Sequence, residues 1–532
     1  MYKISPKSLA FILVTSLALG LFALRTSIVS GQLALPITYD DNGYFLDALR
    51  RLSIGSSNGL LAMVRDAWIN PPHSPYSSFM CALSFWMFGP HMWAPAALNI
   101  ALVMLALLAA RRVTSNIPLR WFVPISVAIA TWPIMSFLVV ESRPDIVCAG
   151  LTVFAALGIV QNRWLAATHK HRLSMAALFG LAVLAKPSIS PLTITAFVLC
   201  IALASSVDMI EHRPAGWKGA LVKANTAAIF VVLLFAAAYS PSGWHQIIDY
   251  IKWATAGNDT GSYFLKGGFR TQALYYISGI GGKALIGAWA FVSLLLMLTG
   301  LFLFWRRHVD SGSRLRVASA AIVALFLYAS VSLTGLKSIY LGAVVPWLFF
   351  FLFLQGLNSI YAASGPRAFA ILAIALAVFG VEKYEPHWER KAGQRVVVSR
   401  EEAAWRTKLL QDIATDLVTR GVGKQQVFLT STEPYLNSTT LNLATFALHA
   451  PDLTPTDLNY SDKMSDVDDA FSKTNFVLAF SPDNPDVLKW LPSYKLLEPT
   501  WIELQHSNQF KLLRTFPNQT GGSIVLYGKV AQ

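Results

Sequence analysis

Residues 9–29 read LAFILVTSLALGLFALRTSIV, a predominantly apolar stretch whose one charged residue is Arg25. About 20 such residues in an α-helix cross a hydrocarbon core of about 30 Å. A cleaved signal peptide is the alternative, but this apolar core is long for one and many more apolar stretches follow it. The stretch therefore predicts a first transmembrane helix.

Similar apolar stretches recur along the chain. Of its 532 residues 54% are hydrophobic and 14% are charged, whereas soluble domains carry about 25% charged residues. The further predicted spans are 92–110, 121–140, 146–161, 173–187, 188–206, 224–240, 283–305, 315–335, 339–356 and 367–382. The sequence thus predicts a polytopic α-helical membrane protein with about 11 transmembrane helices.

Basic residues set the orientation. The net charge of +14 comes mainly from short loops between apolar stretches, which argues for membrane topology and against nucleic-acid binding. The positive-inside rule assigns to the cytoplasm Lys3, Lys7, Arg111, Arg112, Arg120, Arg163, Lys170, Arg172, Arg213, Lys218, Lys223, Arg306, Arg307, Arg314, Arg316 and Arg367. If the apolar residues 74–89 formed a full span, Arg111 and Arg112 would lie on the outer side. An interfacial or re-entrant segment on the outer face is therefore predicted at 74–89.

Two parts of the chain are distinguished. Residues 1–382 form the predicted transmembrane domain, with outer loops at 30–91 and 241–272. Residues 383–532 are polar and predict an outer-face soluble α/β domain, with an accessory or acceptor-binding role. Its clearest elements are a helix at Trp405–Leu417 and buried strands at Gln426–Thr430, Phe476–Phe480 and Ser523–Tyr527.

The most informative polar motif is TYDDNGYF, residues 38–45. Adjacent carboxylates at a membrane surface repel each other, and burial disfavours their ionised forms, so the pKa of one should rise. In an extended segment neighbouring side chains point opposite ways, so one acid could face a reaction centre while the other holds a helix N-terminus or a cation. The alternative is an acid that only caps the helix beginning near Tyr44, which is amphipathic and suited to the membrane interface.

Cations are predicted on the same face as these acids. Arg143 precedes Asp145 where two spans meet, and its planar fork suits a phosphate, although snorkelling or an Arg143–Asp145 pair would also explain it. Lys186 lies between two apolar stretches, where an anion or the interface would offset the cost of its charge. Further predicted outer cations are Lys266, Arg270 and Lys337.

Other polar residues carry weaker signals. His73 follows Pro71-Pro72, close to the acids, although an ordinary solvent-facing histidine explains it as well. The cysteines, Cys81, Cys148 and Cys200, lie in apolar segments without metal-like spacing. The sequence shows no full set of metal ligands.

This pattern resembles the membrane-embedded GT-C glycosyltransferases, in particular the protein O-mannosyltransferases and lipid A aminoarabinose transferases. The resemblance covers residues 9–190 by motif. It rests on Asp40-Asp41 with Tyr44, Pro71-Pro72, Phe88-Gly89, Arg143-Pro144-Asp145 and Lys186-Pro187. This sequence has Asp41 where the family often has Glu, and His73 where it has an apolar residue.

The resemblance implies inverting transfer of a sugar from a polyprenyl-phosphate donor to an acceptor hydroxyl on the outer (periplasmic or luminal) face. A bacterial inner membrane is the expected location. Asp40 would be the general base, and Asp41, Tyr44, His73 and Asp145 would position substrates. The donor phosphate would meet Arg143, Lys186, Lys266, Arg270 and Lys337.

No cofactor is required by this scheme, and a divalent metal on Asp41 is left open. Lipid, glycan and protein acceptors also remain open, as does the sugar. The alternatives from other classes are a lipid-linked-sugar flippase and a membrane assembly subunit. Because the charges lie mainly at span ends, the sequence favours the enzyme.

Overall fold

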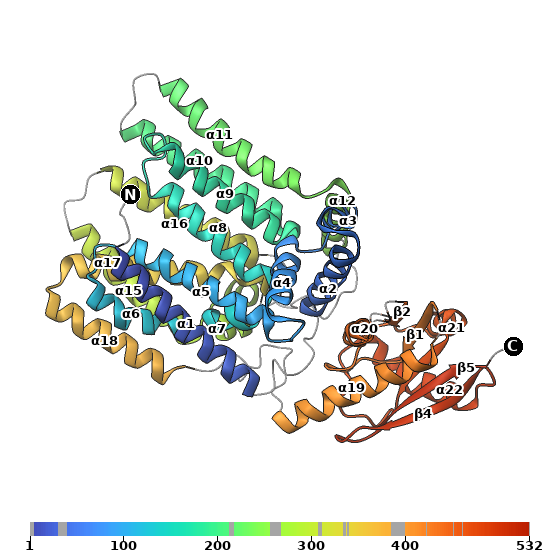
Figure 1. The fold of residues 1–532 in the computed structure, drawn as a ribbon. Coiled ribbons are helices and arrows are strands. Elements are labelled where there is room, and N and C mark those ends of the chain that lie inside the picture. The colour runs from blue at the N-terminus through green and yellow to red at the C-terminus, as the bar shows by residue number, and fades with distance from the viewer. Residues whose placement is uncertain are drawn as a thin grey trace.

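The fold was analysed in a computed structural model of the chain. It describes residues 5–29, 40–211, 217–255, 268–306, 311–333, 337, 340–384, 399–421, 423–448, 450, 452–459 and 461–530, with the backbone alone at 40, 41, 250, 253–255 and 280. A bundle of helices and a C-terminal domain with a β-sheet lie beside each other (Figure 1).

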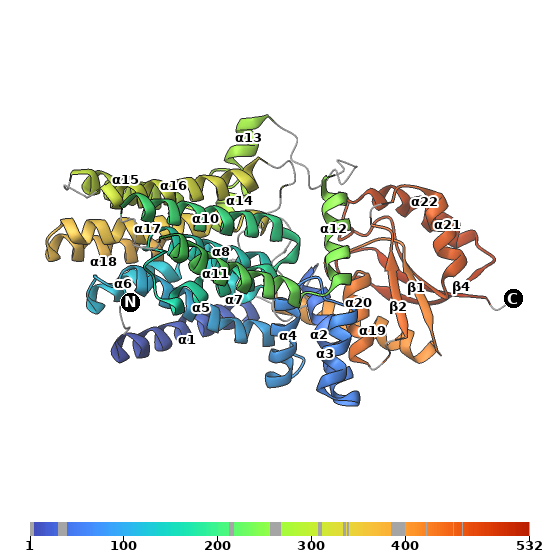
Figure 2. The ribbon, with the colours of Figure 1, turned by 90° about the horizontal axis from the view of Figure 1, so that it is seen from above.

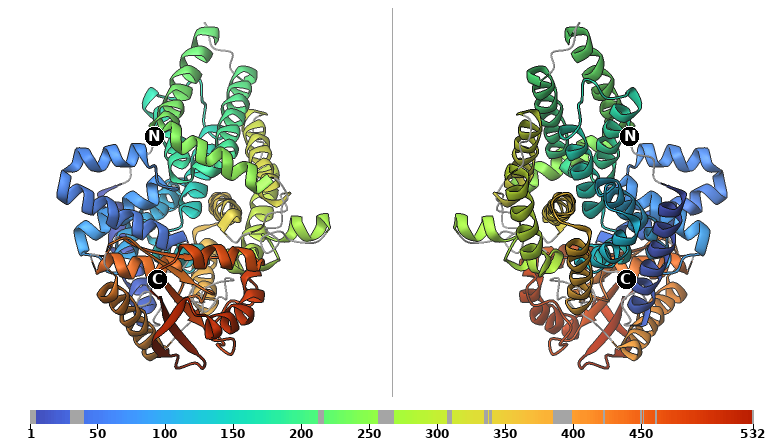
Figure 3. Two further views of the ribbon diagram at one scale, coloured as in Figure 1. Left: turned by 90° about the vertical axis from the view of Figure 1, so that its right-hand side faces the viewer. Right: turned by 90° about the vertical axis from the view of Figure 1, so that its left-hand side faces the viewer.

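The bundle confirms a multi-pass membrane architecture, and Figure 3 shows it nearly end-on. By length and composition, 7 described helices suffice to span a membrane, or 8 if one bent pair counts as a span. The seven are α1 (Pro6–Val29), α5 (Ala94–Val113), α10 (Ser190–Glu211) with the turn η1 (Pro187–Ile189), α11 (Trp217–Ala238), α15 (Trp289–Arg306), α16 (Ser311–Ser332), and α17 (Val344–Ala363) with the turn η2 (Tyr340–Gly342).

Three further bundle helices have 17 residues each, namely α8 (Pro144–Val160), α9 (His169–Ala185) and α18 (Pro366–Glu382). They coincide with predicted spans but are shorter than the length that a perpendicular helix needs. The count of about 11 spans therefore stays a prediction.

The predicted span at 121–140 is broken in the structure. It forms α6 (Leu119–Ala130) and α7 (Pro133–Val140), whose axes differ by 70°. Trp132 is extended, and Pro133 has no N–H group to continue the hydrogen bonding of α6. All residues of α7 are buried, so the bend directs the chain through the core of the bundle toward Glu141.

Aromatic rings fill the core beside this bend. The rings of Trp132 and Trp289 stack with centroids 5.4 Å apart, and Phe353 meets both edge-on at 5.7 and 5.6 Å. Nearby, a Cβ on Gly300 would lie 3.0 Å from the Cα of Gly356. This pair of glycines lets α15 and α17 approach closely, as small residues do in membrane helices.

A buried ion cluster ties together one end of the bundle. Arg316 on α16 lies 2.7 Å from Asp208 and 2.6 Å from Glu211, both on α10. It also donates a hydrogen bond to the carbonyl of Asn162. Arg316 thus bridges two carboxylates of α10, and a buried cation paired in this way holds α16 against α10.

Short helices lie toward the end of the bundle that faces the C-terminal domain. They are α2 (Asp40–Asn58), α3 (Leu60–Ile69), α4 (Pro75–Phe88), α12 (Pro241–Thr255), α13 (Phe269–Leu274) and α14 (Ile280–Leu285). Figure 2 shows α2, α3 and α12 lying across the direction of the bundle helices. The segment predicted to be interfacial or re-entrant, 74–89, coincides with α4.

The C-terminal domain has five strands in the order β2-β1-β3-β5-β4. β1 is parallel to β2 and β3, whereas β5 is antiparallel to β3 and β4. Its elements are α19 (Arg400–Arg420), β1 (Gln425–Leu429), α20 (Ser438–Ala447), β2 (Leu453–Asp457), α21 (Met464–Lys473), β3 (Phe476–Phe480), η3 (Pro492–Leu496), α22 (Leu497–His506), β4 (Phe510–Pro517) and β5 (Ser523–Lys529).

The predicted helix and strands of this domain are present, with boundaries that differ by a few residues. The sequence did not indicate β2 and β4, which form the two edges of the sheet. β2 contains Pro455, and buried residues alternate with exposed threonines along it. Most of β4 is exposed or half-buried. Edge strands tolerate such residues because only one side pairs, so they lack the continuous apolar run of β3.

A buried acid follows β1. Glu433 is 2% exposed, and its Oε1 accepts a hydrogen bond from Asn484 Nδ2 at 2.7 Å. Loss of hydration raises the pKa of Glu433 to about 7, and nearby Asp486 acts in the same direction.

We therefore expect stability to fall as pH rises between about 4.5 and 7. In this window the carboxyl of the folded protein keeps its proton, whereas that of the unfolded chain, with a pKa of about 4.3, has lost it. The difference lowers the free energy of unfolding by on the order of 3 kcal/mol by pH 7. Glu433→Gln should remove that slope, measured by thermal unfolding of the full chain in detergent from pH 5 to 8. Exposed Glu401→Gln is the control, and an unchanged slope in Glu433→Gln would contradict the assignment.

Candidate active site

Two charged segments meet where α8 begins and α9 ends. Pro144 occupies the first position of α8, where its missing N–H costs nothing. Arg143 is the residue just before the helix, and Asp145 lies in the first turn. Lys186 ends α9, and its Nζ lies 3.4 Å from Asp145 Oδ2. The two side chains are 8% and 6% exposed, so this is a buried ion pair.

Arg143 is buried against an aromatic ring. Its guanidinium carbon lies 4.4 Å from the ring centroid of Tyr340 in η2, and the residue is 7% exposed. A small cavity of about 10 Å³ beside it is also lined by Tyr76, Asn99 and Glu141. Stacking on a ring leaves the edge of a guanidinium able to donate hydrogen bonds in the ring plane.

Asn99 of α5 fixes the backbone that leads to Arg143. Its Nδ2 donates to the carbonyls of Val139 at 3.2 Å and Glu141 at 3.1 Å, which would otherwise lack a partner where α7 ends. On the other side, Trp347 Nε1 donates to the carbonyl of Ile146 at 2.8 Å. Arg143 is therefore held by a rigid backbone between two bundle helices.

Lys337 is a buried cation that lies beyond the end of α16 and binds the last carbonyls of that helix. Its Nζ donates to the carbonyls of Val331 at 3.0 Å and Ser332 at 2.8 Å, at the end of α16. It also lies 5.2 Å from the ring centroid of Tyr276, and desolvation lowers its pKa. These contacts account for Lys337 without a phosphate, so its predicted donor role remains a prediction.

The turn η2 connects these two cations. Its Tyr340 contacts Arg143, and a Cβ on its Gly342 would lie 2.0 Å from the ring of Tyr276. Any larger residue at Gly342 would therefore displace the ring that faces Lys337.

The remaining predicted residues are less closely associated with this site. Arg270 is exposed on α13, which projects away from the bundle (Figure 2 and Figure 3). His73 is exposed beside the double proline. Tyr44 is 3% exposed and belongs to an apolar cluster with Phe45 and Phe85, so it packs α2 against α4.

Three predicted residues cannot be placed by their side chains. Lys266 lies outside the described residues, and of Asp40 and Asp41 only the backbone is described, as the first turn of α2. The position of these acids relative to Arg143 is therefore argued from the contacts of α2.

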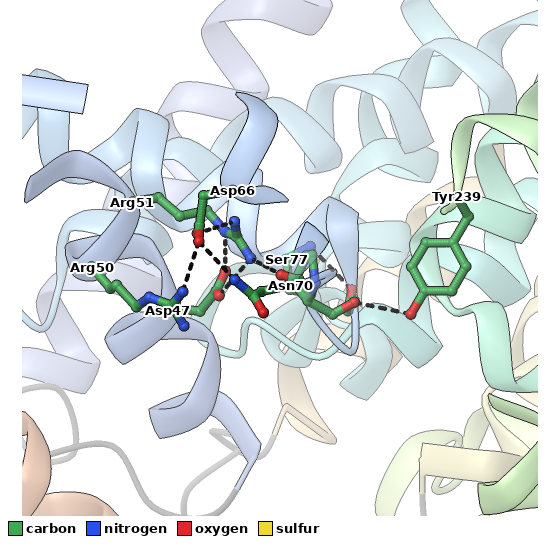
Figure 4. A network of polar contacts seen from close by, with 9 residues as sticks. Asp47, Arg50, Arg51, Asp66, Asn70, Ser77 and Tyr239 are labelled. Atoms are coloured by element: carbon green, nitrogen blue, oxygen red, sulfur yellow. Dashed lines mark hydrogen bonds and ion pairs between the residues drawn. The ribbon is translucent and has the colours of Figure 1, made fainter. Parts of the chain in front are cut away.

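An ion network, not foreseen from the sequence, fixes α2 (Figure 4). Arg51 forms a bidentate pair with Asp47, with both distances 2.8 Å, and a further pair with Asp66 of α3 at 3.1 Å. Arg50 lies 2.8 Å from the other oxygen of Asp66, and Arg51 also donates to the carbonyl of Asn70 at 2.8 Å. The network clamps α2 to α3 and to the start of the double-proline turn.

The start of α4, which follows the double proline, is hydrogen-bonded to both charged segments. Ser74 Oγ donates to the carbonyl of Ala185, next to Lys186, at 2.7 Å, and Ser77 Oγ donates to the carbonyl of Ser142, next to Arg143, at 2.8 Å. Tyr239 donates to the carbonyl of Pro72 at 3.2 Å. Only the Asp47–Arg51 spacing of four residues on a helix could have been recognised in the sequence.

The fold is that of the GT-C membrane glycosyltransferases, as solved structures show. Over 96% of this chain it matches 97% of ArnT from Cupriavidus metallidurans in the apo state, with a TM-score of 0.53 and 14% sequence identity. ArnT bound to undecaprenyl phosphate matches with a TM-score of 0.54, 13% identity and 98% coverage of both chains. The mycobacterial arabinofuranosyltransferase AftD matches all of this chain and 42% of its own, with a TM-score of 0.56 and 14% identity.

No protein-family model and no curated protein sequence matches the chain. The similarity therefore lies in the fold, at an identity too low to carry a substrate or a mechanism across.

Proposed function

We propose that this protein transfers a sugar from a polyprenyl-phosphate donor to an acceptor hydroxyl at the outer face of the membrane. The observation that carries the proposal is the pair of hydrogen bonds from Ser74 and Ser77 to the residues next to Lys186 and Arg143. Through these two hydrogen bonds, the segment from α2 to α4, which begins with Asp40 and Asp41, is joined to the segments that carry Lys186 and Arg143. The undecaprenyl phosphate bound by ArnT, which has the same fold, supports the donor class.

The chemistry requires a base on one side and cations on the other. Asp40 takes the proton of the acceptor hydroxyl, and the oxygen of that hydroxyl bonds to the anomeric carbon of the sugar. The bond between that carbon and the phosphate oxygen breaks, and the polyprenyl phosphate leaves with an additional negative charge. Arg143 offsets this charge from a buried position where the interaction is weakly screened, and a single displacement inverts the anomeric centre.

The prenyl chain has a suitable place beside the site. An apolar cavity of about 250 Å³ lies among α1, α5, α6, α7 and α18, lined by residues that include Phe22, Val103 and Val139. Val139 lies two residues before Glu141, which lines the cavity beside Arg143. A lipid in this apolar cavity would therefore bring its phosphate toward Arg143.

The proposal includes the topology. We count 11 spans by adding the bent pair α6–α7 and the 17-residue helices α8, α9 and α18 to the seven long helices. The N-terminus then faces the cytoplasm of a bacterial inner membrane, and the domain from 383 to 532 lies outside. Among the described residues no group of three metal-ligating side chains is present, and a metal on Asp41 stays a prediction.

The test of the function uses purified full-length protein in liposomes with undecaprenyl phosphates bearing different radiolabelled sugars. Membrane lipids, glycans and proteins from a bacterial extract are supplied separately as acceptors. We expect label to appear in one acceptor fraction, with release of undecaprenyl phosphate. Movement of labelled donor between leaflets without transfer would instead establish a flippase.

Arg143→Lys is expected to lower kcat/KM for the donor about 100-fold, since lysine keeps the charge but loses the planar fork and its stacking on Tyr340. The measurement is transfer as a function of donor concentration. Arg111→Lys is a matched control, because Arg111 also stacks on a ring, at 5.4 Å from Phe122, while donating to carbonyls at the end of α5. Unchanged donor dependence in Arg143→Lys would refute the phosphate role.

A further inference from the structure

In the described part of the chain, a helix of the C-terminal domain contacts a helix of the membrane part. α20 of the C-terminal domain packs on α2, next to the turn that carries Asp40 and Asp41 (Figure 1 and Figure 2). We call the contacting residues the α2–α20 joint: Asn42, Tyr44 and Phe45 of α2 with Thr439 and Leu443 of α20.

The apolar end of the joint is well packed. Leu443 is 4% exposed and belongs to the same buried cluster as Tyr44, Phe45, Cys81 and Phe85 rather than to either core of its own domain. Full burial of a leucine side chain contributes about 2 kcal/mol, so this contact favours docking of α20 on α2.

The polar end of the joint is only partly satisfied. Asn42 is fully buried, and its Nδ2 donates to Thr439 Oγ1 over 3.4 Å, a long hydrogen bond. Its Oδ1 is buried and has no hydrogen-bond partner among the described residues. An unpaired buried carbonyl costs about 1–3 kcal/mol, so stability alone would favour an apolar residue at this position.

Thr439 is itself held in place. Asn437 caps α20 by accepting from the backbone N–H groups of Thr439 and Thr440, at 3.1 and 3.0 Å, and the hydroxyl of Thr439 donates to the same Asn437 oxygen at 2.6 Å. The Thr439 hydroxyl therefore has its lone pairs fixed toward Asn42. The capped N-terminus of α20 thus meets the buried amide of Asn42, two residues after Asp40.

We infer that the C-terminal domain positions the Asp40–Asp41 turn through this joint, with Asn42 and Thr439 as positioning residues for sugar transfer. The inference rests on the proposed function, and it assigns to the domain a direct part in the reaction. Neither residue touches the reacting atoms; each acts through the backbone of the first turn of α2. A misplaced base slows the chemical step while donor binding at Arg143 is unaffected.

The kinetic test uses Thr439→Val, which removes the hydroxyl but keeps the shape, and Asn42→Ala. Each should lower kcat about 10-fold, with the donor KM within about twofold of wild type. Thr445→Val is the matched control, because that buried hydroxyl lies on α20 but donates only to the carbonyl of Asn442. The double variant Asn42→Ala/Thr439→Val should be no slower than either single variant. Wild-type kcat in both single variants, or additive losses, would overturn the inference.

A second test needs no activity, so its result is separate from that of the proposed function. Asn42→Cys/Thr439→Cys, in a full chain with a protease site placed between residues 385 and 398, should form a disulfide on mild oxidation that keeps the cleaved parts together. Cys81 belongs to the same buried cluster as Leu443, so the variant is made in a Cys81→Ala chain, whereas Cys148 and Cys200 are buried in the bundle. Separation of the two parts after oxidation and cleavage would show that the joint does not exist, whatever the chain catalyses.

Discussion

Asp40→Asn should lower kcat for sugar transfer by about 10²–10⁴-fold, the usual contribution of a positioned general base. The amide is nearly isosteric with the carboxylate and can still cap α2, so helix geometry should survive. An amide does not take up the proton of the acceptor hydroxyl, and therefore the chemical step itself is slowed. The donor KM should stay close to that of wild type. The measurement is transfer of labelled sugar in liposomes at saturating donor and acceptor.

Two further variants make this result specific. Asp249→Asn on α12 makes the same chemical change at a residue whose side chain is 74% exposed, and it should leave kcat unchanged. Asp41→Asn should be less damaging than Asp40→Asn, since Asp41 is assigned to positioning the acceptor or α2. Transfer by Asp40→Asn near the wild-type rate would rule out Asp40 as the base. A larger loss in Asp41→Asn would move that role to its neighbour.

Lys186→Met should destabilise the protein by about 3–5 kcal/mol, because it leaves the carboxylate of Asp145 buried without its partner. Thermal unfolding in detergent, followed with transfer activity, measures the effect. Lys186→Met/Asp145→Asn removes both charges and should recover most of the lost stability. A single variant as stable as wild type would show that the pair contributes nothing to the fold.

The same double variant separates structure from chemistry. If Lys186 also offsets the charge of the donor phosphate, the restabilised double variant should still need a higher donor concentration. Wild-type donor dependence in a well-folded double variant would restrict Lys186 to holding α9 against α8. Arg143, whose guanidinium lies against the ring of Tyr340, would then be the main phosphate ligand.

The expectations from the sequence succeeded where they depended on composition over many residues. Long apolar stretches are helices, and Phe476–Phe480 is a buried strand with the predicted boundaries. They fell short where one backbone position mattered: at Trp132-Pro133 a predicted single span bends by 70°. The sequence also did not indicate which anion would face Lys186, which pairs with Asp145 from another helix. That partner is distant in the chain, and no local pattern reveals it.

The sequence by itself determined that this chain enters a membrane many times and ends in a separate α/β domain, because hydrophobicity over about 20 residues is a local property. It also supplied the charged residues of the site. Only the tertiary structure decided which segments meet: Ser74 and Ser77 bind the backbone beside Lys186 and Arg143, and α20 docks on α2. Such contacts depend on hydrogen bonds of about 3 Å between helices far apart in the chain, a precision that periodicity does not encode.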